Sequence, residues 1–329
     1  MASFDVMPDV QLYQPAELED ALNLADQLGD KGWILGGGQD TYGWLKDRAK
    51  HPQAMIDLTG IEALRGVRET SDGIEIGATT TLREVIRDER IKRDYSLLIS
   101  AADVVASPQI RNVGTLGGNL TQDTRCWYYR RGLDCYRAGG NICYANSTES
   151  MNREHCVFGA SRCVAVSPSD TAIALTALDA KMVIQSMDGQ RVVTADDFFV
   201  GPDTHITSMT SLGRREILTA IRIPSKWAGK KFYFEKVADR NVWDFALVSI
   251  AAAMSIDGDA IADSRFVLGG VACTPHRLRN VERAARGKSL SEESAAALAS
   301  LASEGAQPLK YNHYKLPLME NLVRRATRA

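Results

Sequence analysis

A cysteine-rich segment constrains the fold of this chain more than any other part of its sequence. Five of the six cysteines lie between residues 126 and 163, in the stretch CWYYRRGLDCYRAGGNICYANSTESMNREHCVFGASRC. The stretch is rich in Arg, Asn, Gly and Ser and lacks apolar periodicity, so it predicts a long ordered loop. A loop of this length inside a compact domain needs a source of order, and a metal centre would supply one.

The residue types alone leave several roles open for these cysteines. A disulfide framework is typical of small secreted domains, whereas this chain has 329 residues and begins with MASFDVMPDV, which predicts no signal peptide. Structural zinc favours closely spaced cysteine pairs, and no such pair occurs here. An iron–sulfur cluster tolerates wide and irregular spacing. The thiols could also be unligated, so the spacing favours a cluster without establishing it.

Charge and hydropathy exclude several classes of protein. The 39 Lys and Arg residues nearly balance the 41 Asp and Glu residues, for a formal net charge of −2. Nothing in this balance calls for nucleic acid or an anionic membrane as partner. No apolar run is long enough to cross a bilayer. We therefore expect a soluble, cytoplasmic protein of two or three compact units, with no membrane insertion.

Helical and strand patterns are mixed along the chain. Helices are expected at residues 15–28, 82–87, 96–105, 168–179, 292–302 and 316–328. Strands are expected at residues 33–35, 55–58, 74–76, 164–166, 217–223, 232–237, 249–256 and 266–271.

Two glycine clusters favour the binding of an anion. The strand at 33–35 runs into residues 36–41 (GGGQDT), and residues 114–119 (GTLGGN) precede the cysteine-rich segment. Without a Cβ, glycine lets backbone N–H groups approach a phosphate. The first cluster is neither a Rossmann fingerprint nor a P-loop, because GxGxxG, a clear following helix and the GK[ST] ending are absent. Each cluster could be a tight turn, but together they would suit a dinucleotide stretched between them.

Five ordered motifs extend this interpretation to a family. LGGGQDT, NVGTLGGNL, SPSDTAIALTALDA, RNVWDFALVSIAAAM and LGGVACTPHR resemble the FAD subunit of the molybdenum hydroxylases, the xanthine dehydrogenase family, over nearly the whole chain. The resemblance implies an α+β fold: a vanillyl-alcohol-oxidase (PCMH)-type FAD-binding domain of two subdomains plus a C-terminal α+β domain. The expected units are residues 1–60, 61–215 and 216–329, with an inserted iron–sulfur loop at 121–168.

The same resemblance implies which residues hold the flavin. Both glycine clusters would contact the phosphates and the ribityl chain, and Asp170 of the SD element would bond the cofactor from the other side. Lys236 begins a family-like K-x3-R-x3-D-F-A run and is expected near the flavin. The expected FAD-binding residues are Leu35, Gly36, Gly37, Gly38, Gln39, Asp40, Thr41, Gly114, Thr115, Gly118, Asn119, Asp170 and Lys236.

The insertion narrows the resemblance to part of the family. The GGN and SD elements usually lie a few residues apart, whereas residues 121–168 separate them here. Two branches carry a [4Fe–4S] cluster in such an insertion, the PaoABC-type aldehyde oxidoreductases and the 4-hydroxybenzoyl-CoA reductases. The resemblance implies Cys126, Cys135, Cys143 and Cys163 as ligands with Cys156 unligated, and an exchange of Cys135 for Cys156 stays open.

Three arginines lie among these cysteines and have two alternative roles. Arg130, Arg131 and Arg137 would either offset the negative charge of a thiolate-bound cluster or be solvated.

The family implies an oxidoreductase subunit that relays electrons and has no catalytic residue of its own. Substrate, an aldehyde or aromatic compound, would react at a molybdenum cofactor on a large partner subunit. Two [2Fe–2S] clusters of a small partner would pass electrons to FAD here, and the [4Fe–4S] cluster would connect FAD to an external electron carrier. The expected assembly is a heterotrimer or a dimer of heterotrimers. A hydroxybenzoyl-CoA-type reductase with reversed flow, a stand-alone FAD oxidase and a zinc-stabilised binding module remain alternatives.

Overall fold

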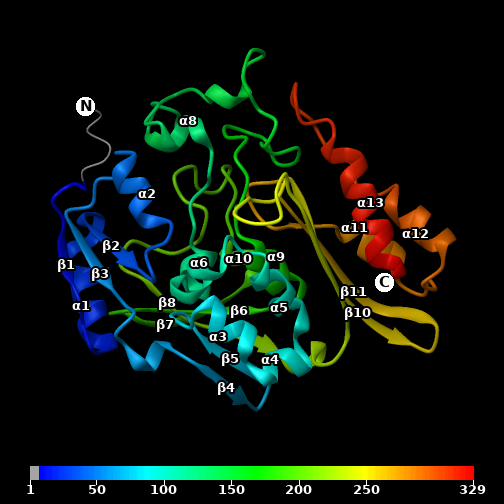
Figure 1. Cartoon of the computed structure of the whole chain (residues 1–329), viewed down its shortest axis with the longest axis horizontal. Coiled ribbons are helices and arrows are strands. Elements are labelled where there is room, and N and C mark those ends of the chain that lie inside the picture. Colours follow the sequence, from blue (N-terminus) through cyan, green and yellow to red (C-terminus); the bar gives the residue numbers. More distant parts are fainter. Residues whose placement is uncertain (1–6) are drawn as a thin grey trace.

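The computed structural model describes residues 7–329 and divides them among three units, each built on its own sheet (Figure 1). Residues 1–6 of the MASFDVMPDV segment, for which the sequence predicts no signal peptide, lie outside the described residues. Helices and strands are mixed along the chain, which confirms the expected α+β class. No helix in the described part is both long and apolar enough to cross a bilayer.

The first unit, at the left of Figure 1, is a three-stranded parallel sheet with the strand order β1-β3-β2. Its elements are β1 (Gln11–Tyr13), α1 (Leu18–Leu28), β2 (Gly32–Leu35), α2 (Thr41–Lys46) and β3 (Ala54–Asp57). Helix α1 ends at Gly29, whose φ of 50° suits glycine at a helix end. Its face with Ala21 and Ala25 packs in one core with Ile56 of β3.

Helix α2 shows that one expectation was wrong, because a helix does follow the first glycine cluster. Strands β2 and β3 are parallel, and α2 lies between them in the sequence. Six residues are too few to display a helical period, so the sequence pattern does not reveal it. Burial of Trp44 and Leu45 holds this short helix in place.

The middle unit has a five-stranded antiparallel sheet with the order β4-β5-β8-β6-β7. Its strands are β4 (Val67–Thr70), β5 (Gly73–Gly77), β6 (Lys181–Ser186), β7 (Gly189–Thr194) and β8 (Ile217–Pro224). Its helices are α3 (Leu82–Arg87), α4 (Glu89–Asp94), α5 (Ser96–Asp103), α6 (Pro108–Val113), α7 (Leu116–Leu120), α9 (Asp170–Ala177) and α10 (Ala195–Phe198). The sheet therefore includes residues just beyond the expected boundary at 215–216.

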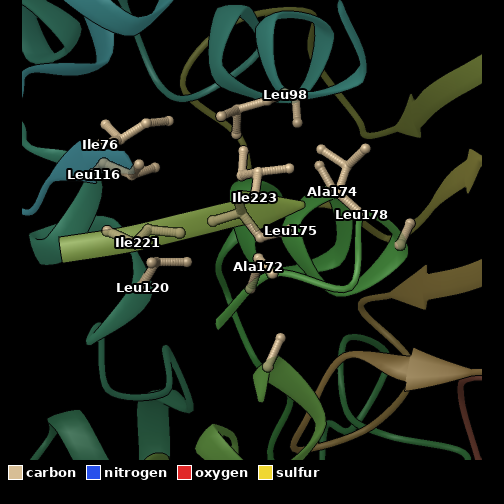
Figure 2. Close-up of a cluster of buried hydrophobic side chains, with 14 of the residues drawn as sticks. Ile76, Leu98, Leu116, Leu120, Ala172, Ala174, Leu175, Leu178, Ile221 and Ile223 are labelled. Atoms are coloured by element: carbon tan, nitrogen blue, oxygen red, sulfur yellow. The ribbon is translucent and has the colours of Figure 1, made fainter. Parts of the chain in front are cut away.

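The core of the middle unit fixes the two helices that matter for the site (Figure 2). Leu98 of α5, Leu175 of α9 and Ile223 of β8 are buried in it, together with Leu116 and Leu120 of α7. Burial of a side chain of this size contributes roughly 1.5–3 kcal/mol. Because α7 contains most of the second glycine cluster and α9 begins with the SD element, this core sets their relative position.

The C-terminal unit, at the right of Figure 1, has a four-stranded antiparallel sheet with the order β12-β11-β10-β9. Its strands are β9 (Lys231–Val237), β10 (Val248–Asp257), β11 (Ala260–Gly269) and β12 (His276–Arg277). Its helices are α11 (Arg279–Ala285), α12 (Glu292–Ala299) and α13 (Lys315–Arg328), which share a hydrophobic core with the sheet.

Residues 121–168 form the expected long loop, which lies at the top of Figure 1. It contains the short helix α8 (Trp127–Arg130) and two single 3-10 turns, η4 (Tyr136–Ala138) and η5 (Tyr144–Asn146). The strand expected at 164–166 is wrong. The carbonyl of Val164 instead accepts from the Cys156 N–H at 2.8 Å, and the carbonyl of Ala165 accepts from the Cys273 thiol at 2.9 Å. The apolar run therefore packs inside the loop rather than in a sheet.

Candidate functional site

A cleft of about 280 Å³ lies between the first and middle units and is lined by both glycine clusters. The expected site residues on its lining are Gly36, Gly38, Gln39, Asp40, Thr41, Gly114, Thr115, Gly118 and Asn119. Leu35 is buried at the end of β2, just before the first cluster. The tertiary structure thus brings together two segments that are far apart in the sequence.

The first glycine cluster has the backbone of an anion-binding loop. Gly37 and Gly38 have φ values of 83° and 73°, which favour glycine. A Cβ on Gly37 would lie 2.3 Å from the Val113 carbonyl oxygen, and one on Gly38 would lie 2.9 Å from the Tyr42 ring. Within residues 7–329, the backbone N–H groups of Gly37, Gly38 and Gln39 donate no hydrogen bond to the protein. They are available to a phosphate.

The second glycine cluster is tied to the first by hydrogen bonds through Thr115. The Gly118 N–H donates to Thr115 Oγ1 at 3.0 Å, and the Asn119 N–H donates to the Thr115 carbonyl at 2.9 Å. Thr115 Oγ1 in turn donates to the Gly36 carbonyl at 2.9 Å. A Cβ on Gly118 would lie 2.5 Å from that carbonyl oxygen. Glycine is needed here because the two clusters touch backbone to backbone.

Asp170 and Lys236 form a buried ion pair behind the cleft. Lys236 Nζ donates to Asp170 Oδ2 at 2.6 Å, and both side chains are nearly inaccessible to solvent. Asn119 of the cleft accepts hydrogen bonds from Ser169 Oγ at 2.7 Å and Thr171 Oγ1 at 2.5 Å, which flank the aspartate. Burial raises the pKa of Asp170 to about 6, although Lys236 acts in the opposite direction. Desolvation therefore outweighs the ion pair.

Asp170 faces a second, smaller cavity of about 70 Å³ rather than the larger cleft. Cys126 and His155 of the insertion line the same cavity. His155 Nδ1 and Ser249 Oγ, which also border it, are buried without a hydrogen-bond partner among the described residues. The cysteine-rich loop and the SD element therefore meet at one unfilled polar space.

The buried ion pair gives a pH-dependent prediction for the flavin-free protein. Lys236→Met leaves the Asp170 carboxylate buried and uncompensated, so we expect the free energy of unfolding at pH 8 to fall by about 3–5 kcal/mol. The raised folded-state pKa means that the Asp170 contribution is favourable below its unfolded value of 3.8 and is lost as pH rises through about 6. The penalty should therefore shrink at pH 5, where the carboxyl is protonated.

Urea unfolding of wild type and variant at both pH values measures this effect. The double variant Lys236→Met/Asp170→Asn is the control, because it removes both charges and should recover much of the loss at pH 8. An equal penalty at pH 5 and pH 8 would show that lost packing, and not an unpaired charge, causes the destabilisation.

The insertion is anchored to the first glycine cluster by ion pairs that sequence reasoning missed. Asp40 accepts from Arg125 Nη1 at 2.5 Å, from Arg130 Nη1 at 3.3 Å and from Trp44 Nε1 at 2.9 Å. A Cβ on Gly43 of α2 would lie 2.4 Å from the Arg130 guanidinium, which stacks over Trp44. No local motif signals these pairs, since the partners are 85 and 90 residues apart.

The cysteines of the insertion gather around Cys126, which belongs to two packed groups. On one side it packs with Cys135 and Trp44, and on the other with Cys163 and Cys273. Cys273, the sixth cysteine, comes from the C-terminal unit, and no sequence motif placed it here.

Cys143 and Cys156 pack together with Val164 in a third group. Among the described residues, no three His, Cys, Asp or Glu side chains already adopt a metal-ligand arrangement. The ligand roles expected for Cys126, Cys135, Cys143 and Cys163 therefore stay predictions.

The thiols influence one another electrostatically. Burial, together with a charge on Cys163, raises the pKa of Cys126 and of Cys156 to about 12. Interaction with Cys273 and with the Arg137 guanidinium lowers the pKa of Cys163 to about 6. Cys163 is thus the thiol most ready to ionise and bind a cation.

Arg137 is a buried cation with unused donors next to these thiols. Its Nη2 contacts Met209 Sδ at 2.8 Å and its Nη1 lies 3.5 Å from Asp123 Oδ1, but Nε and Nη1 form no hydrogen bond within the described chain. Arg130 is also buried, whereas Arg131 is exposed, so solvation describes only Arg131. Unused donors beside several thiols fit a thiolate-bound cluster, whose sulfur atoms would accept them.

Two family models together cover most of the chain. Residues 8–226 match the family described as the FAD binding domain in molybdopterin dehydrogenase. The chain belongs to this family of flavoprotein subunits. Residues 233–329 match the C-terminal domain of CO dehydrogenase flavoprotein.

Relatives of this family confirm the expected fold and the oxidoreductase class. The chain is 34% identical over 294 residues to the aldehyde oxidoreductase FAD-binding subunit PaoB of Escherichia coli, covering 88% of both chains. It is 28% identical over 329 residues to the carbon monoxide dehydrogenase medium chain of Hydrogenophaga pseudoflava, covering 98% of both. A solved structure of that carbon monoxide dehydrogenase superposes with a TM-score of 0.79 at 27% identity, over 98% of both chains.

Part of the cleft lining has no sequence signal. Thr79 follows β5. The segment before β8 contributes Thr210, Leu212, Gly213, Arg214 and Glu216 to the lining without a recognisable motif. The middle sheet alone brings them to the cleft, because β5 and β8 are neighbours in it. Only a residue-by-residue comparison with family members could have found them.

Proposed function

We propose that this chain is the electron-transferring FAD subunit of a molybdenum-dependent aldehyde oxidoreductase and that its insertion holds a [4Fe–4S] cluster. It would assemble with a large molybdenum-cofactor subunit and a small subunit that carries two [2Fe–2S] clusters. An external carrier would exchange electrons with the insertion. The similarity to PaoB supports the aldehyde class, since that relative is itself an aldehyde oxidoreductase subunit.

The larger cleft fits FAD. The free N–H groups of Gly37, Gly38 and Gln39 would donate to phosphate oxygens, and Thr115 and Asn119 would line the opposite wall. When bound, FAD supplies the conversion between one-electron and two-electron transfer. The chain's own part is to hold the cofactor in this cleft, with Asn119 joining the cleft wall to the SD element.

The observation that carries the cluster proposal is where the insertion docks. Arg125 binds Asp40 of the first glycine cluster. The next residue, Cys126, lines the same small cavity as Asp170. The cysteines are therefore held against the flavin site rather than on a remote surface. Four thiolates at this place would hold a centre that supplies single-electron transfer.

Packing bears on which four thiols are the ligands. Cys126, Cys143 and Cys163 belong to both sets that the sequence left open. Cys135 packs with Cys126 and with Trp44 of α2, so it contacts one of the three shared ligands. Cys156 packs with Cys143 and also interacts electrostatically with Cys163, so it lies close to two of them. We therefore favour Cys156 over Cys135 as the fourth ligand.

Metal and flavin analysis of the full chain, purified without oxygen, tests the proposal. We expect one FAD and about four irons per chain, with an EPR signal after dithionite reduction. A chain that contains flavin but no iron would contradict the proposed cluster and would still support a flavoprotein subunit. Zinc without flavin would support a zinc-stabilised binding module, and substrate oxidation by the isolated chain would support a stand-alone oxidase.

A further inference from the structure

Lys315 is a completely buried cation at the start of α13 that has no carboxylate partner. Its Nζ donates to the carbonyl oxygens of Glu154, at 3.2 Å, and Gly270. None of the ion pairs formed by residues 7–329 includes it. The first turn of a helix is also the end at which the dipole disfavours a positive charge. A buried cation in such a place needs an anion nearby.

The structure points Lys315 toward the cysteine site. Asn312, one turn earlier, donates from Nδ2 to the carbonyls of His155, at 3.0 Å, and Cys156, at 3.1 Å. This clamp holds the start of α13 against the Cys156 peptide. Burial lowers the pKa of Lys315, and a charge on Cys156 acts in the opposite direction, as expected for neighbours of opposite charge. The Glu154 carboxylate acts on Lys315 in the same direction, but its side chain is 72% exposed, whereas Cys156 is buried. Cys156 is thus the buried anionic group available to Lys315.

Arg137 is a second buried cation close to these cysteines. The residue is 3% exposed, and its guanidinium interacts with Cys163 and keeps donors unused. Two buried cations therefore interact with the thiols, Arg137 from the insertion and Lys315 from the C-terminal unit. Arg137 has Asp123 at 3.5 Å, whereas Lys315 has no carboxylate in ion-pair contact, so without an anionic centre the buried charge of Lys315 would be uncompensated.

We propose that Lys315 is the counter-cation of the cysteine-bound cluster, where it raises the reduction potential of the cluster and ties α13 to the loaded insertion. The inference rests on the proposed function. A [4Fe–4S] centre with four thiolates is an anion that gains one more negative charge when it is reduced. A nearby buried cation stabilises the reduced form, and net charge is among the factors that set such potentials. Lys315 is a positioning and tuning residue, not a ligand.

Redox titration of the iron-loaded chain, followed by EPR, tests the charge directly. Lys315→Met removes the charge and the hydrogen bonds, whereas Lys315→Gln removes the charge but keeps a donor. Both should lower the reduction potential of the cluster while iron content stays unchanged. Lys310→Met is the matched control, because Lys310 lies on the preceding loop, is half-exposed and pairs with Glu149. The reduction potential of the cluster in Lys310→Met should equal that in wild type.

Thermal unfolding supplies a second measurement that does not depend on the potential. Lys315→Met should lower the Tm of the loaded chain and raise the Tm of the iron-free chain, in which the lysine has no counter-ion. An iron-loaded Lys315→Met variant with the wild-type reduction potential would overturn the inference. A shift of that potential in Lys315→Met but not in Lys315→Gln would overturn it as well. If the Lys315→Met variant binds no iron at all, a Tm of the variant below that of iron-free wild type overturns the inference. Iron-free wild type would instead contradict the proposed function.

Discussion

Replacing Gly37 with alanine is expected to reduce FAD affinity by at least about 100-fold, or roughly 2.7 kcal/mol. Gly37 has a φ of 83°, and a left-handed conformation alone costs an alanine roughly 1–2 kcal/mol. The new Cβ would also lie 2.3 Å from the Val113 carbonyl oxygen, so the loop must move. Such movement would misdirect the N–H groups that we assign to the phosphates. Flavin absorbance of the purified variant, and titration of its apoprotein with FAD, measure the loss.

Gly66→Ala is the matched control for this experiment. Gly66 has a similar φ of 94°, but a Cβ there would meet no atom within 4 Å. The variant therefore carries the same backbone strain without the collision, and it should lose about 1 kcal/mol of stability while it retains FAD. Equal flavin loss in both variants would show that strain anywhere in the fold, and not the shape of this loop, controls binding.

Exchanging single cysteines for serine should separate the two possible ligand sets. Cys156→Ser is expected to lower iron from about four to near zero per chain, because three remaining thiolates hold a cube poorly. Cys135→Ser should keep nearly all of its iron, since Cys135 contacts Cys126 alone among the shared ligands, whereas Cys156 interacts with both Cys143 and Cys163. Both side chains are buried in wild type, so the two substitutions are similar in size and environment. Iron analysis and EPR of the two variants give the answer.

The opposite pattern, with iron lost only in Cys135→Ser, would restore the ligand set implied by the family resemblance. Flavin content serves as the internal control, because a variant that has merely misfolded should lose FAD as well. Cys273→Ser adds a further comparison: this thiol bonds to the Ala165 carbonyl, so its removal should leave iron in place.

The sequence was a good guide to elements that are built locally. Helix α1, with its apolar face and terminal glycine, and α3, which starts with a capping box at Thr81 and Glu84, lie where the patterns place them. The strand expected at 164–166 was wrong because a short apolar segment has the same sequence pattern in a strand and in a packed loop. Helix α2 was missed because its stability comes from the burial of Trp44 under Arg130, a residue far away in the chain.

The sequence by itself determined the family, the two glycine clusters and the presence of five cysteines within one loop. These are local properties, since backbone freedom and motif order are written in consecutive residues. The tertiary structure decided which groups face one another: Asp40 with Arg125, Asp170 with Lys236, and Asn312 with the Cys156 peptide. The cost of burying a charge depends on everything packed around it, and sequence spacing does not contain that information.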